Sequence, residues 1–207
     1  MMNAAIGLEQ LADESPLVRS ARQTSCRLLY VNQERLRHSA AVAARAHSLA
    51  DAVPDDQRDL LVAAAWLHDV GYAEALRDTG FHPVDGARFL RSTRWESRVC
   101  DLVAHHSGSR FVAALRGMVS ELAEFDWAQD AVSDALTIAD QTVGPNGRPV
   151  SLEDRMQDML DRHGPDSPNA RAHPQRRAYF RAAFERVSSR LAGSESGQVL
   201  QGEAARV

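Results

Sequence analysis

Residues 60–71 have the sequence LLVAAAWLHDVG, an apolar run that ends in an adjacent histidine and aspartate. On a period of about 3.6 residues, His68 falls on the same face as Leu61 and Ala65. Its imidazole therefore points where a core residue is expected. Burying it beside the carboxylate of Asp69 is costly unless both groups have partners. The pair thus indicates either a hydrogen-bonded core histidine or a metal ligand. The positions of the other polar residues in the sequence distinguish these two interpretations.

The same helical period recurs along nearly the whole chain. No stretch shows the polar and apolar alternation that is typical of a strand. Capping residues, prolines and glycines mark helix ends, as at Ser15-Pro16 and at Gly71. The expected helices cover residues 16–30, 33–52, 55–69, 84–92, 96–106, 111–125, 129–143, 151–163 and 175–192. The pattern predicts an all-α fold, a single helical bundle.

Composition divides the chain into four parts. Residues 1–28 are expected to form an N-terminal tail and a first helix, and residues 29–165 the main domain. Residues 166–192 begin as a linker containing Pro, Ser and Asn and end in a C-terminal helix. Residues 193–207 are rich in Gly, Ser and Gln, a composition that predicts a disordered tail.

The overall composition is that of an ordinary soluble globular protein, with 207 residues, 44% hydrophobic and 25% charged. A formal net charge of −4 argues against a general nucleic-acid surface. No apolar stretch approaches the roughly 20 residues that span a bilayer, and no signal-peptide pattern opens the chain. We therefore expect a cytoplasmic protein that does not act on membranes. Cys26 and Cys100 are isolated, with no disulfide framework.

The chain contains no lysine, so all 24 of its basic side chains other than histidine are arginines. A lysine base, Schiff base or lysine phosphate anchor is therefore excluded. Any phosphate clamp must use arginine, histidine, backbone N–H groups or a metal ion.

Further histidines and aspartates lie at helix ends or on inward helix faces. His38 faces the same way as Ala41 and Val42, and Asp140 lies at the edge of an apolar stripe. Each alone is commonly a surface or helix-end residue, but that explanation does not account for so many together. The set is His38, His68, Asp69, His82, His105, His106 and Asp140. The other three histidines, His47, His163 and His173, lie in polar or linker contexts typical of the surface.

In this order the residues resemble the H…HD…D motif of the HD-domain superfamily of metal-dependent phosphohydrolases. His68-Asp69-Val70-Gly71 is similar to the signature in which HD is followed by a hydrophobic residue and glycine. The segment 82–87, HPVDGA, resembles the helix start of many members, and His105-His106 resembles the paired histidines of the binuclear branch. The resemblance covers about residues 30–145 and implies a helical bundle with metal at its centre.

The resemblance also implies a ligand set. His38, His68, Asp69 and Asp140 would hold one ion. In members with a second ion, Asp69 bridges the two, and the second site is completed by His82, His105 and His106. We therefore expect one or two divalent transition-metal ions, drawn from Fe, Mn, Zn, Ni and Co, because imidazole and carboxylate together suit these metals.

The implied reaction is hydrolysis of a small phosphorylated substrate, such as a nucleotide, by water activated at the metal. Asp69 is a candidate for orienting that water. Arg110, which follows the paired histidines, and Arg148, in a Gly/Pro loop, are candidates for stabilising charge on the phosphoryl group. Arg35, about one turn before His38, is a weaker candidate of the same kind.

The chain departs from its relatives at two places. Tyr72 stands where many members have lysine after the signature glycine. The segment after His106 lacks the Glu and the Gly-Tyr-Pro triplet of cyclic-dinucleotide phosphodiesterases. Two alternatives to a hydrolase stay open on the sequence alone. One is a di-iron oxygenase resembling myo-inositol oxygenase, which uses a similar ligand set; the other is a non-catalytic, metal-stabilised regulatory module.

Overall fold

Side-chain caps set where the first helices begin. In the computed structural model, which describes residues 14–164, 166–193, 197 and 200, Ser15 caps α1 (Pro16–Leu28) by accepting a hydrogen bond from the Val18 amide. Asn32 caps α2 (Gln33–Ser48) in the same way through the Arg35 amide. These caps satisfy backbone N–H groups that have no partner inside the helix. The short 3₁₀ segments η1 (Ala50–Ala52) and η2 (Asp55–Gln57) then lead into the next helix.

The central element is α3 (Arg58–Leu67). Every residue from Leu61 to Leu67 is buried, so this helix is apolar on all sides over its last seven positions. A helix of this kind is stable only when other helices surround it. It packs against α1, α2, α5 (Ser97–His105) and α8 (Ala131–Gln141). The stretch that ends in His68-Asp69 therefore runs through the middle of the bundle.

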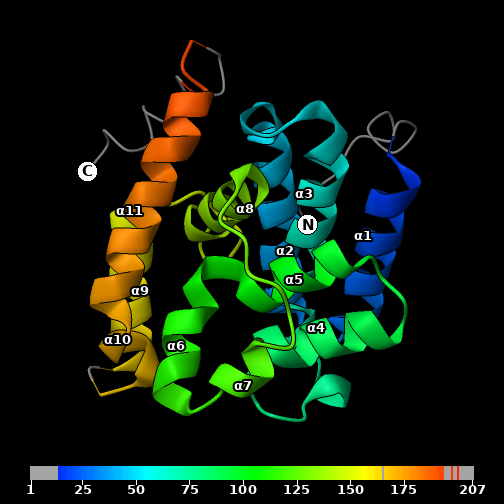
Figure 1. Ribbon diagram of the computed structural model, residues 1–207, viewed down its shortest axis with the longest axis vertical. Helices are drawn as coiled ribbons and strands as arrows, with labels where there is room; N and C mark the ends of the chain where they lie inside the picture. The colour runs from blue at the N-terminus through cyan, green and yellow to red at the C-terminus, as the bar shows by residue number, and fades with distance from the viewer. Residues whose placement is uncertain (1–13, 165, 194–196, 198–199, 201–207) are drawn as a thin grey trace, which may run out of the picture.

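The remaining elements complete the bundle around this centre (Figure 1). After α3 the chain forms η3 (Val70–Tyr72), η4 (Glu74–Leu76) and α4 (His82–Ser92). After α5 come η5 (His106–Gly108), α6 (Ser109–Arg116) and α7 (Val119–Leu122). After α8 come α9 (Leu152–His163), α10 (Pro168–Arg171) and α11 (His173–Arg190). The described residues contain no β-strand, and the predicted all-α bundle is confirmed.

Several helix boundaries differ from the expected ones; the helix expected over 33–52, for example, ends at Ser48 and is followed by η1. The helix expected over 111–125 is two helices, α6 and α7, because Gly117 adopts a left-handed conformation with φ 69° and ends the first. The linker after residue 164 contains the short helix α10, which Ser167 caps. His82 begins α4, whereas the helix was expected from residue 84. The expected N-terminal tail at 1–13 and most of the expected tail at 193–207 lie outside the described residues.

A buried ion pair joins α11 to α8. Asp134 on α8 is fully buried and accepts hydrogen bonds from Arg186 at 2.6 and 2.8 Å and from Arg190 at 2.9 Å. Both arginines lie on α11 and are about a third exposed. A carboxylate without solvent needs such partners. The helices α9, α10 and α11 therefore form a layer fixed to one side of the bundle, on the left in Figure 1.

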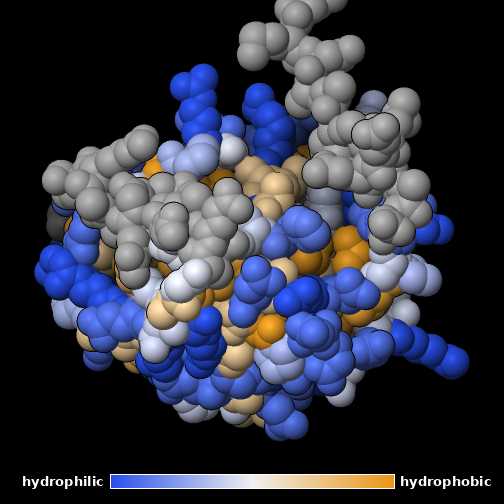
Figure 2. Space-filling model, turned by 90° about the horizontal axis from the view of Figure 1, so that it is seen from above, coloured by the Kyte–Doolittle hydropathy of each residue, from blue (hydrophilic) through white to orange (hydrophobic). Residues whose placement is uncertain are grey.

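No helix in the described part of the chain is long and apolar enough to cross a membrane. The face seen in Figure 2 is mostly hydrophilic, with small hydrophobic areas between the polar side chains.

We expect Asp134→Asn to lower the free energy of unfolding by about 1–3 kcal/mol, because it removes charge-assisted hydrogen bonds that a buried side chain makes. Urea denaturation followed by circular dichroism measures this change. The matched control is Asp51→Asn, since Asp51 forms a surface pair with Arg58 and is 54% exposed. That control should cost less than about 1 kcal/mol, and equal losses in the two variants would contradict the anchoring role of Asp134.

Candidate metal centre

Six of the polar side chains singled out in the sequence meet at the centre of the bundle. His68 and Asp69 follow the last residue of α3, where the helix gives way to η3. The others come from four different elements: His38 from α2, His82 from the first turn of α4, His106 from the end of α5 and Asp140 from α8. All are buried except His82, which is partly exposed. The bundle thus concentrates imidazoles and carboxylates where apolar side chains would normally pack.

Three of the imidazoles are oriented in the same way. The Nδ1 atom of His38 faces the Gly144 carbonyl at 3.0 Å, that of His68 faces the Ala65 carbonyl at 2.7 Å, and that of His106 faces the Val103 carbonyl at 2.6 Å. A carbonyl oxygen only accepts, so each Nδ1 carries the proton and donates it. Each Nε2 is then directed towards the cluster. Metal-binding histidines have this arrangement, because the backbone bond fixes both the tautomer and the ring.

The first group of candidate ligands is His38, His68 and Asp69, whose ligand atoms lie within 4.8 Å of one another. Asp140 adjoins it: its Oδ1 is 2.9 Å from His38 Nε2 and 3.8 Å from His68 Nε2. These are the four residues that the family resemblance assigns to one ion. Two imidazoles and two carboxylates form a donor set that suits divalent transition metals.

The second group is Asp69, His82 and His106. Asp69 Oδ1 lies 3.4 Å from His82 Nε2 and 3.9 Å from His106 Nε2, and the two Nε2 atoms are 3.3 Å apart. Asp69 belongs to both groups, with its Oδ2 on the side of His68 at 3.5 Å. A carboxylate that faces both groups is suited to bridge two ions, as the resemblance implies for Asp69.

The unpaired atoms of the cluster fit a metal ion. His68 Nε2 is buried and has no hydrogen-bond partner. A buried lone pair without a partner carries a desolvation cost that a bound cation would remove. His38 has acceptors on both sides, the Gly144 carbonyl and the Asp140 carboxylate. The pair formed with Asp140 therefore needs a cation between its two atoms, either a proton or a metal ion.

The charges within the cluster are mutually stabilising. Burial alone would raise the pKa of Asp69, but the positive charges of His68 and His82 when protonated, and of Arg35, outweigh it and hold that pKa well below its usual range. Burial likewise opposes ionisation of Asp140, and a hydrogen bond from His38 keeps its pKa low. Both carboxyl groups are therefore ionised at neutral pH. Burial lowers the pKa of His82 and of His106, which keeps these imidazoles neutral and able to bind a metal ion.

A second layer of contacts holds Asp140. Its Oδ2 accepts hydrogen bonds from the Ser107 hydroxyl and from the Gln141 amide, the latter at 2.8 Å. Ser107 has φ 50° and ψ 35°, a left-handed conformation that costs a non-glycine residue energy. The turn after His106 thus keeps a strained residue whose side chain orients a candidate ligand.

Arg35 and Tyr72 cover the other side of the cluster. Arg35 Nη1 donates to Asp69 Oδ2 at 3.0 Å, and its guanidinium lies 4.2 Å from the centre of the Tyr72 ring. Tyr72 in turn stacks on His82, with ring centres 4.0 Å apart and planes inclined by 19°. Tyr72, in the position where many relatives have lysine, therefore links Arg35 to a candidate ligand by stacking.

Three of the expected site residues do not join the cluster. His105 points away and contacts the Phe125 carbonyl through Nε2 at 2.9 Å. Consecutive residues on a helix are about 100° apart, so His105 and His106 cannot both face the centre. Arg110 stacks on Trp127, 4.0 Å from the ring centre, and Arg148 is exposed on its loop. Neither Arg110 nor Arg148 lines the cavity beside the cluster.

The cavity beside the cluster has a volume of about 290 Å³, which is enough for a small metabolite. His38, Asp69, His82, His106 and Asp140 form part of its wall. Its arginines are Arg35, Arg116, Arg155, Arg162 and Arg176. Of these, sequence analysis singled out Arg35 alone. In the sequence, Arg155 and Arg176 are basic residues in polar helices. Such residues are common on protein surfaces, so nothing nearby in the sequence indicates that these two line a cavity.

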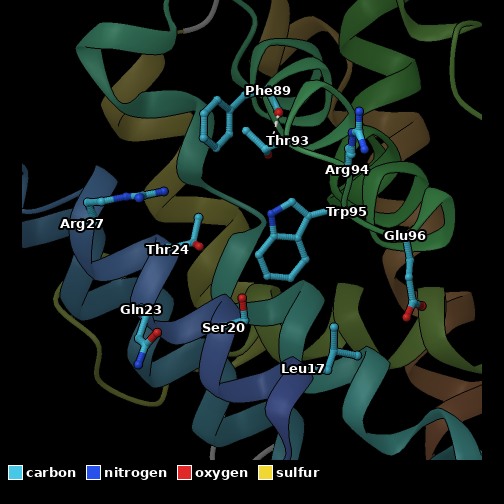
Figure 3. Close-up of a pocket in the computed structure, with 10 residues that line it drawn as sticks. All are labelled: Leu17, Ser20, Gln23, Thr24, Arg27, Phe89, Thr93, Arg94, Trp95 and Glu96. Atoms are coloured by element: carbon cyan, nitrogen blue, oxygen red, sulfur yellow. Dashed lines mark hydrogen bonds between the residues drawn. The ribbon is translucent and has the colours of Figure 1, made fainter.

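A second cavity, of about 720 Å³, lies between α1 and the end of α4 (Figure 3). Trp95 points into it, across from Ser20 and Leu17. It contains no histidine, and its one acidic side chain is Glu96. Despite its larger volume, this cavity lacks the donor set that a transition metal requires.

The fold and the cluster together define a helical bundle built around a candidate metal centre. A family model described as HD domain matches residues 35–164, which is more than half of the chain. The chain therefore belongs to the HD-domain family, in the superfamily of metal-dependent phosphohydrolases. The comparisons found no match among curated proteins and none among solved structures.

We expect His68→Ala to reduce the metal content of the purified protein, because it removes an Nε2 atom that has no other partner. Inductively coupled plasma mass spectrometry measures the metal per chain. His105→Ala is the control, since it removes a neighbouring imidazole that faces away from the cluster. Equal metal content in wild type and His68→Ala, or a selective loss in His105→Ala, would contradict the assignment.

Gly71 allows α4 to approach Asp69. A Cβ atom at this position would lie 2.0 Å from the His82 carbonyl oxygen and 2.7 Å from the Gly86 nitrogen. Gly71 of the HD signature and Gly86 of the 82–87 segment therefore lie in close backbone contact. This close contact of two backbones places the first turn of α4, and with it His82, beside Asp69.

We expect Gly71→Ala to destabilise the fold by about 1–3 kcal/mol, because the added methyl group must push the backbone of α4 away. It should also weaken binding of the ion that His82 would hold, measured as metal per chain. Gly117→Ala is the control: it strains a residue with φ 69° that has no atom within 4 Å of the added Cβ. It should cost about 1–2 kcal/mol and leave the metal content unchanged.

Proposed function

We propose that the chain is a phosphohydrolase that cleaves a small phosphoester, such as a nucleotide, by attack of metal-activated water. The observation that carries this proposal is the pair of His/Asp groups sharing Asp69, with their Nε2 atoms directed inwards. Bound divalent ions would lower the pKa of water and polarise a phosphoryl oxygen. Membership of the HD-domain family supports the same class of reaction.

The residues around the cluster have separate roles in this proposal. His38, His68, Asp69 and Asp140 hold one ion, and Asp69, His82 and His106 hold a second. Asp69 Oδ2 accepts a hydrogen bond from Arg35 Nη1 at 3.0 Å. A carboxylate oxygen of Asp69 can orient a water molecule by accepting the same kind of hydrogen bond. Arg35 is the arginine closest to Asp69, so it takes the charge-stabilising role expected of Arg110 and Arg148.

The test is phosphate release from nucleotides and small phosphoesters, with EDTA-treated protein and Fe, Mn, Zn, Ni or Co added back one at a time. We expect turnover only with added metal. Asp69→Asn should reduce kcat/KM by at least about a hundredfold, because it weakens a ligand shared by both groups. His105→Ala should keep activity close to wild type.

Two outcomes would overturn the proposal. Bound iron with oxygen uptake and no phosphate release would identify an oxygenase. Stoichiometric metal without turnover of any phosphoester, together with a loss of stability in Asp69→Asn, would identify a non-catalytic module whose metal ion is structural.

A further inference from the structure

Arg176, on α11, is a buried cation without an anionic partner. The residue is 9% exposed, and its only hydrogen bond among the described residues runs from Nη2 to the Ser107 carbonyl at 3.3 Å. Its Nε is buried and has no hydrogen-bond partner, and its guanidinium carbon lies 5.1 Å from the centre of the Phe180 ring. Burial lowers the pKa of Arg176 to about 10, so the side chain is still charged at neutral pH. A guanidinium taken out of water in this way is costly unless an anion compensates it.

Arg155, on α9, faces the same cavity and is also incompletely paired. It is 9% exposed, its Nε is buried without a partner, and its Nη1 contacts Asp158 at 3.4 Å. Its Nη2 is 3.9 Å from Asp140 Oδ1, too far for a hydrogen bond. Two buried guanidinium groups therefore present unused N–H donors beside the candidate metal centre.

The charge of the cavity wall differs from that of the whole chain. The wall contains five arginines and two carboxylates, Asp69 and Asp140, whereas the chain as a whole has a net charge of −4. Both carboxylates belong to the candidate ligand set, and bound ions would add further positive charge. Even with Arg155 and Arg162 partly compensated by Asp158, the cavity wall therefore favours an anionic ligand.

The positive groups lie on two sides of the cluster. Arg35 contacts Asp69, whereas Arg155 and Arg176 lie on the Asp140 side, the latter through the carbonyl of Ser107. At the rim on this second side, Arg162 of α9 is 36% exposed and paired with Asp158 at 2.8 Å. Positive charge thus lies both on the Asp69 side and on the Asp140 side of the cluster.

We propose that Arg155 and Arg176 form a second anion subsite, which binds a phosphate group that the enzyme does not cleave. The substrate class is thus a compound with at least two phosphate groups, one at the metal centre and one on the arginines of α9 and α11. The geometry of guanidinium N–H donors matches phosphate oxygens, and a planar fork binds two of them at once. The inference rests on the proposed function for the cleaved phosphate, but the subsite itself consists of side chains that need no metal.

The test is calorimetric binding of methylenebisphosphonate and of methylphosphonate to the full-length protein loaded with Mn²⁺, so that both the metal centre and the arginine subsite are present. We expect the bisphosphonate to bind at least about tenfold more tightly, since it adds charge-assisted hydrogen bonds. Arg176→Gln should abolish this preference. Arg177→Gln, which removes the neighbouring exposed cation of the same helix, should retain it. Because no turnover is measured, the result does not depend on whether the chain is a hydrolase.

Folding is checked by the thermal unfolding of each variant. If Arg176→Gln fails to fold, Arg155→Gln replaces it, because Arg155 is the other side chain of the subsite and its loss should likewise weaken bisphosphonate binding. Equal affinity of wild type for the two probes would overturn the subsite. An unchanged preference in the folded Arg176→Gln variant, or in Arg155→Gln when that variant stands in for it, would also overturn it. If the protein hydrolyses phosphoesters but does not prefer the bisphosphonate, the subsite is wrong and the proposed function is still supported.

Discussion

The rest of the structure depends on bringing two buried carboxylates and four imidazoles together at one point, with only His82 partly exposed. Neither Asp69 nor Asp140 could remain ionised there without the histidines and Arg35 around it. The histidines in turn need fixed acceptors, which the carbonyls of Ala65, Val103 and Gly144 provide. Because these groups come from five elements, the ends of α3, α4 and α5 must all fall at the same place. The bundle is organised around this requirement rather than around a purely apolar core.

Much of this could be predicted from the sequence, for reasons that differ from residue to residue. His68 and His38 follow an apolar helical period, so their inward direction could be inferred directly. His106 shares a face with Val99 and Val103, both buried, whereas His105 lies a third of a turn away. The family resemblance assigned both histidines to the second ion, whereas the helical period shows that only His106 shares the buried face. Gly117 could have predicted the break between α6 and α7, because glycine often ends a helix; the helical period of apolar residues does not take this into account.

The arginines of the site were predictable only in part. Arg35 lies one turn from His38 on the same helix, so its proximity follows from local geometry. Arg155 and Arg176 reach the cavity because α9 and α11 fold back over it, which is a property of the tertiary packing. The charged end of an arginine lies far from its backbone, whereas a helical period predicts only the direction of Cβ. The position of these guanidinium groups therefore could not be inferred from the sequence. For the same reason the sequence could not show that the guanidinium of Arg110, a candidate for the site, stacks on Trp127 and Phe111 instead of lining the cavity.

The family match ends at residue 164, but the cavity wall does not. Arg176 lies on α11, and this helix is attached to the bundle through Asp134 on α8, six positions before the ligand candidate Asp140. A fragment cut after residue 164 would keep every candidate metal ligand but would lose Asn169 and Arg176 from the cavity wall. It would also leave the buried carboxylate of Asp134 without Arg186 and Arg190. We therefore expect the smallest stable unit of this chain to be longer than the matched domain and to include α11, which a boundary drawn by sequence similarity would remove.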